Sequence, residues 1–141
     1  MRPDRIRESL VNLLENLGGR AAGAWRIEGG RLVLVAFEPA PDLAPEVAIG
    51  FEESTRSVDL SMLDLGIVRA VSTGEVAVSI AGELPPETGS GRWLRAFSAD
   101  RSIAVPVLEA SGKVEGVVSI ALGLQPSSEV VEAAIRVMVR N

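Results

Sequence analysis

The pair Gly29-Gly30 constrains the fold more than any other feature, because it lies between two stretches of strand-forming composition. Both central residues of a two-residue hairpin turn adopt positive φ angles, which glycine reaches without steric cost. We therefore predict strands over Ala21–Glu28 and Arg31–Glu38 that pair antiparallel. Leu32–Phe37 is apolar throughout, which predicts that both faces of the second strand are covered.

A second hairpin is predicted nearer the end of the chain. Arg101–Glu109 and Lys113–Leu122 have strand composition and flank a turn that contains Gly112. A further strand is predicted over Glu75–Ile80, with a short extended piece over Ser57–Leu60. Hairpins imply an antiparallel sheet.

Helices are predicted at both ends of the chain. In the first, over about residues 3–17, apolar residues recur at spacings of three and four. In the last, over about residues 127–140, they form a stripe as wide as a core-facing helix needs, and Val137 and Val139 lie outside it. Such surplus apolar residues predict either burial on several sides or contact with a partner, which a second copy or a following domain would supply.

Three short helices are predicted between the hairpins. Asp42, Asp64 and Ser90 precede them and are of the residue types that cap helix N-termini. The chain is thus predicted to be one domain over residues 1–141, with the sheet and the short helices over residues 21–124. The fold class is α/β (α+β), a five- to six-stranded antiparallel sheet with helices on both faces.

Composition excludes several kinds of chemistry. The 141 residues include no Cys, no His and no Tyr. Disulfides, thiol nucleophiles and thiolate metal sites are therefore unavailable, and so is the imidazole that most often serves as general base or metal ligand. Asp59 and Asp64 flank a short turn and could hold a metal, but a cap and a surface charge explain them more simply. We expect no enzymatic activity and no metal.

Charge and hydropathy bear on the partners. The net charge of −5 argues against nucleic-acid binding, which usually needs a basic surface. The N-terminal residues are charged and lack the apolar run of a signal peptide, and no apolar run approaches the roughly 20 residues that span a bilayer. We expect a cytoplasmic protein that binds neither nucleic acid nor membrane.

Three sequence segments, in this order, resemble the GAF domain, a sensory module related to PAS. Gly66–Val76 (GIVRAVSTGEV) is similar to the short helix, Thr-Gly-Glu turn and strand of that family. Asp100–Val107 (DRSIAVPV) and Gly112–Val118 (GKVEGVV) are similar to its proline-containing strand and the strand that follows. The resemblance covers roughly residues 5–124, and none of the matching segments is catalytic.

The resemblance implies a regulatory domain, in bacterial-style signalling, that binds a small molecule between sheet and short helices or serves as a dimer module. The Asn-Lys-Phe-Asp-Glu signature of cyclic-nucleotide sensors is absent. The Cys that holds a linear tetrapyrrole and the His that usually holds haem are absent too. Free methionine sulfoxide reductases of this family use Cys, so their activity is not expected. We predict no known cofactor and an unidentified small-molecule ligand.

The resemblance also suggests where a ligand would lie. Trp93 and Phe97 follow a long Gly- and Pro-rich loop, where GAF domains often place a pocket wall. The alternative is that Trp93 only fills the core. The candidate ligand-binding residues are two tryptophans, two phenylalanines, one arginine and one serine: Trp25, Phe51, Trp93, Phe97, Arg101 and Ser102.

Three functions stay open at this point. The first is a non-catalytic sensory or regulatory domain that binds a small molecule. The second is a purely structural dimerisation module, and the third and least favoured is an enzyme of unknown chemistry. A homodimer through the first and last helices is expected in the first two cases, since two-fold dimers are the commonest oligomers.

Overall fold

A computed structural model describes residues 3–140, and within this range the chain forms one six-stranded antiparallel sheet in the order β3-β2-β1-β6-β5-β4. Every neighbouring pair is antiparallel, and β1 and β6 join the two predicted hairpins into a single sheet. The predicted fold class is confirmed. The strands are β1 (Ala21–Glu28), β2 (Arg31–Pro39), β3 (Ser57–Asp59), β4 (Ala77–Ile80), β5 (Arg101–Leu108) and β6 (Val114–Leu122).

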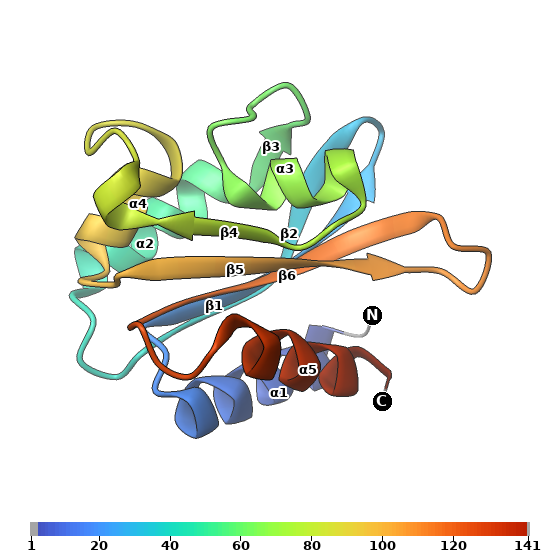
Figure 1. The fold of residues 1–141 in the computed structure, drawn as a ribbon. Coiled ribbons are helices and arrows are strands. Elements are labelled where there is room, and N and C mark those ends of the chain that lie inside the picture. Colours follow the sequence, from blue (N-terminus) through green and yellow to red (C-terminus); the bar gives the residue numbers. More distant parts are fainter. Residues whose placement is uncertain (1–2, 141) are drawn as a thin grey trace.

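Helices cover both faces of the sheet (Figure 1). The terminal helices α1 and α5 lie side by side on one face, and α2, α3 and α4 lie on the other, with a 3₁₀ turn η1 before α4. Among the described residues, no helix is both long and apolar enough to cross a bilayer. The helices are α1 (Pro3–Leu17), α2 (Pro45–Thr55), α3 (Gly66–Thr73), η1 (Ala81–Glu83), α4 (Gly89–Ala96) and α5 (Ser128–Arg140).

The first hairpin contains a feature that the sequence did not indicate. Gly29 and Gly30 have φ angles of 59° and 77°, as the predicted turn requires. Between Ala24 and Trp25 the register shifts, so that Trp25 pairs with Leu34 but Ala24 pairs with Ala36. This is a β-bulge, which adds one residue to β2 and reverses the faces of every residue beyond it.

The core has two layers, one on each side of the sheet. Leu10 of α1 and Val131 and Ile135 of α5 pack fully buried against the alanines, valines and isoleucines of the central strands. On the opposite face, Val68 of α3 and the aromatic residues pack against β1 and β6. The two terminal helices therefore contact the sheet on the side away from α2, α3 and α4.

The three predicted helix caps are corrected by the structure. The residues at the N-caps of α2, α3 and α4 are Ala44, Leu65 and Thr88, none of which makes a side-chain capping bond. Asp42 instead accepts a hydrogen bond from Arg20, and Ser90 lies inside α4. Tertiary partners compete for these polar side chains, which local sequence cannot reveal.

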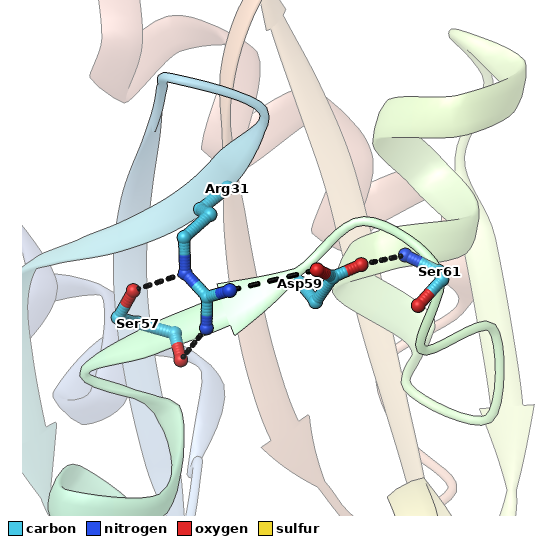
Figure 2. Close-up of polar contacts among 4 residues, drawn as sticks. All are labelled: Arg31, Ser57, Asp59 and Ser61. Atoms are coloured by element: carbon cyan, nitrogen blue, oxygen red, sulfur yellow. Dashed lines mark hydrogen bonds and ion pairs between the residues drawn. The ribbon is translucent and has the colours of Figure 1, made fainter.

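The edge strand β3 pairs with β2 through the backbone, and the side chain of Arg31 adds further contacts (Figure 2). Arg31 donates hydrogen bonds to the hydroxyl and the carbonyl oxygen of Ser57, at 2.7 and 3.1 Å, and lies 3.5 Å from a carboxylate oxygen of Asp59. The other carboxylate oxygen of Asp59 accepts the Ser61 N–H at 2.8 Å. Hydrogen bonding to Ser61, with a smaller contribution from the charge of Arg31, lowers the pKa of Asp59. In the described part of the chain no three acidic residues gather as metal ligands.

Candidate ligand-binding site

A patch of small residues forms the floor of a cavity on the sheet face that carries α2, α3 and α4. Three strands contribute, because Gly23 pairs with Ser119 and Ala121 pairs with both Ala21 and Ser102. Residues two apart in a strand share a face, so small side chains at these positions leave space above the sheet. The floor consists of Ala21, Gly23, Ser102, Ser119 and Ala121.

Aromatic rings enclose the cavity. Phe51 of α2 lies at their centre, with its ring centroid 5.1 Å from those of Phe37, Trp93 and Phe97 and 6.1 Å from that of Trp25. Three of these contacts are edge-to-face, the geometry that the aromatic quadrupole favours. Strands β1 and β2 and helices α2 and α4 are thus joined through one cluster.

Trp25 occupies part of the space above the floor. A Cβ added at Gly23 would lie 2.5 Å from its ring, so the indole lies directly over that glycine. The indole N–H donates to the carbonyl oxygen of Thr55 at 2.9 Å, and only 1% of the residue is exposed. Glycine at position 23 and a tryptophan two residues later on the same face therefore form one structural unit.

The remaining cavity is small and mostly apolar. Its volume is about 50 Å³, which is room for a few water molecules. Pockets that hold drug-sized ligands are several times larger, at roughly 300–1,000 Å³. Ser102 and Ser119 line the cavity and contribute two hydroxyl groups to its floor. These hydroxyl groups are suited to hydrogen bonding with a ligand.

The structure brings together five of the six predicted site residues, namely Trp25, Phe51, Trp93, Phe97 and Ser102. The expectation for Arg101 is corrected. Its side chain lies on the opposite face, where the guanidinium donates to the carbonyl oxygens of Gly123 and Pro126 and to the Ser128 hydroxyl. Strand alternation explains the difference, because successive residues of β5 point to opposite faces.

Phe37, Thr55 and Ser119 also line the cavity and were not predicted. The β-bulge places Phe37 opposite Gly23, whereas an unbroken hairpin register would place it on the other face. Ser119 follows from the pairing of β1 with β6, which joins segments about a hundred residues apart. Only the alternation within β6 could have indicated that Ser119 shares a face with Val117.

Helix α4, which carries Trp93 and is followed by Phe97 at its C-cap, is attached at both ends. At its start, Ser90 donates its N–H to the carbonyl oxygen of Asp64 and accepts the Gly66 N–H at its hydroxyl, at 3.0 and 2.9 Å. At its end, Arg20 donates to the carbonyl oxygen of Phe97 at 2.9 Å and to Asp42 at 2.7 Å. The Arg20 guanidinium lowers the pKa of Asp42 by hydrogen bonding and by its charge.

Comparison with solved structures identifies the fold. A GAF domain of A. aeolicus in an inactive state superposes with a TM-score of 0.70 at 17% identity, over 98% of this chain and 80% of that one. The GAF domain of the Acinetobacter phosphoenolpyruvate-protein phosphotransferase gives 0.67 at 16%, over 98% and 77%. The type II free methionine-R-sulfoxide reductase of Thermoplasma acidophilum gives 0.64 at 18%, over 99% and 93%.

No protein-family model matches the sequence, and no curated protein matches it. The chain has the fold of GAF domains, as its sequence motifs predicted. Structures with this fold include both GAF domains of larger proteins and a free methionine-R-sulfoxide reductase, so function has to be argued from the site.

Proposed function

We propose that the chain is a non-catalytic sensory or regulatory GAF-type domain whose ligand is a compact, mainly apolar molecule with one or two hydrogen-bonding groups. The observation that carries the proposal is the cavity between aromatic rings and a floor of small residues. The hydroxyls of Ser102 and Ser119 in that floor would orient such a molecule. The few polar groups in an apolar pocket are what fix ligand orientation.

The cavity volume restricts the ligand further. A single ring exceeds the present free space, so binding requires Trp93 or another half-buried part of the wall to move outward. That movement would displace α4, whose C-terminal end is bonded to Arg20, the residue before β1, and which is joined to α3 through Ser90. Ligand occupancy would thus be converted into a change in how α4 packs, which requires different ligand affinities for the two packings.

Composition supports a non-catalytic domain. A reductase that works through a cysteine thiol cannot operate in a chain without Cys, and no imidazole is present to act as a base. The pocket-lining side chains include no carboxylate and no amine, and their only polar groups are hydroxyls and the indole N–H groups of two tryptophans. Such a lining suits binding better than proton transfer.

Phenol, a single ring with one hydroxyl, is a suitable probe for this pocket. We expect its addition to shift the indole N–H resonances of Trp25 and Trp93 in an NMR titration, because both rings border the cavity. Ser119→Val should weaken the interaction severalfold, since it removes a hydroxyl and fills part of the floor.

The matched control is Ser72→Val, at an exposed position of α3 outside the pocket. It should leave the titration unchanged. Resonance shifts confined to residues of α1 and α5, on the other face of the sheet, would contradict this assignment of the pocket.

The outward surface of α5 favours a second function, homodimerisation. Val130 and Val137 are exposed on this helix, and a groove runs between α5 and α1. Exposed apolar side chains grouped along a groove are typical of protein–protein contacts. This supports a dimerisation module that operates with or without a ligand.

We expect sedimentation at micromolar concentration to give twice the chain mass of 14.8 kDa. Val137→Glu should restore the monomer mass without unfolding it, because the substituted side chain lies at the surface. Val131 and Ile135 are unsuitable for this test, since both are fully buried against the sheet. A monomeric wild-type protein would refute dimerisation through these helices.

A further inference from the structure

Helix α5 carries two separate apolar stripes. Val131 and Ile135 form the first and are fully buried against the sheet. Val130 and Val137 belong to the second and are 51% and 56% exposed, with the exposed Ala133 between them. Spacings of three and four residues place these three side chains on one face of the helix. The second stripe therefore has no partner within the described part of the chain.

The second stripe continues into the groove between α5 and α1. Ala133, Ala134 and Val137 form one wall of this groove, and Leu13, Asn16 and Leu17 of α1 contribute to the other. Small residues at the middle of the stripe allow another helix to approach closely.

The charges beside the stripe have opposite signs at its two ends. Glu129 lies at the start of α5 and Arg140 at its end, eleven residues apart. Eleven residues are close to three full turns, so both side chains lie on the same flank of the stripe. Neither forms an ion pair among residues 3–140, whereas the neighbouring Glu132 and Arg136 pair with each other at 2.8 Å.

The charges on two copies of α5 are complementary only when the two helices run in opposite directions. In an antiparallel pair of identical helices related by a two-fold axis, the same flank of each helix faces its copy. Glu129 would then face Arg140 of the second copy, and Val130 would face its Val137, with Ala133 and Ala134 near the axis. In a parallel pair, Glu129 and the Arg140 of the second copy would lie at opposite ends of the two helices, so these charges could not pair.

We propose that α5 docks antiparallel on α5 of a second copy of this chain, in the register that opposes Val130 to Val137. The arrangement rests on the dimerisation proposed above and specifies its geometry. It predicts which residues of the two copies lie close enough for a disulfide.

The absence of cysteine allows a clean cross-linking experiment. A disulfide needs Cα atoms about 4.4–6.8 Å apart. Antiparallel pairing separates residue 130 from its own copy by seven residues, which is about 10 Å along the helix. Under mild oxidation, Val130→Cys alone should therefore stay uncross-linked, as should Val137→Cys alone. A mixture of the two proteins should give a covalent dimer, and Ser72→Cys is the control on an unrelated surface.

Charge reversal provides an independent measurement. Glu129→Arg alone and Arg140→Glu alone should each raise the dimer dissociation constant roughly tenfold, because two symmetric ion pairs become repulsive. The double variant Glu129→Arg/Arg140→Glu should restore the wild-type value.

The outcomes separate this arrangement from dimerisation in general. A monomeric wild-type protein overturns both. A dimer in which Val130→Cys cross-links to itself, or whose affinity neither single charge reversal changes, overturns the antiparallel arrangement and leaves dimerisation standing.

Discussion

Replacing Trp25 with alanine should lower the free energy of unfolding by about 3–5 kcal/mol, the range for large aromatic residues removed from a core. Trp25 is 1% exposed, and its ring covers Gly23 and contacts Phe51 edge-on. The substitution also leaves the Thr55 carbonyl without its indole donor. Urea unfolding monitored by circular dichroism measures the change.

Two companion variants separate the contributions. Trp25→Phe keeps an aromatic ring but cannot donate to Thr55, so it should cost about 1–3 kcal/mol for the unpaired carbonyl in addition to a smaller packing loss. Ile27→Ala, on the same face of β1 but only half-buried, is the matched control and should cost less than Trp25→Ala. A loss under 1 kcal/mol for Trp25→Ala would show that the cluster does not support the fold as described.

Replacing Arg101 with alanine should destabilise the protein by about 3 kcal/mol, because two carbonyl groups and one hydroxyl lose a charged donor. Arg101 is 5% exposed, and its bonds to Gly123, Pro126 and Ser128 hold the segment that leads into α5. Faster hydrogen exchange in α5 than in α3 would locate the effect. Denaturant unfolding would give its magnitude.

Arg101→Lys tests whether positive charge alone suffices. Lysine keeps the charge but lacks the planar fork that reaches three acceptors at once, so it should recover only part of the loss. Arg95→Ala is the matched control, since Arg95 is exposed and donates to one carbonyl, that of Ala81. Equal effects of Arg95→Ala and Arg101→Ala would contradict the anchoring role.

The two residues Arg101 and Ser102 connect the proposed site to the proposed interface. Ser102 lines the cavity on one face of β5, and Arg101 holds the start of α5 on the other. A shift of β5 on ligand binding would therefore reach both faces of the sheet. Arg101 positions the start of α5 by its hydrogen bonds, and in the proposed function it would act in that way and not as a ligand contact.

Local sequence determined the elements and their pairing within each hairpin. Gly29 and Gly30 specify a two-residue turn, and apolar spacings of three and four residues specify the terminal helices, because turn geometry and helical periodicity depend on neighbours in the chain. The order of these elements and the GAF-like motifs were enough to predict an antiparallel sheet covered by helices. Trp93 and Phe97 of the pocket were predicted from their position after the long Gly- and Pro-rich loop, whereas Phe37 was not predicted.

Tertiary structure decided which residues face the cavity. The bulge in β2 turns Phe37 toward Gly23, and the pairing of β1 with β6 brings Ser119 beside them. Strand alternation sends Arg101 to the opposite face, where a chain segment more than twenty residues away supplies its acceptors. A one-residue change in register reverses the face of each residue beyond it, and the packing that selects the register comes from strands and helices distant in sequence.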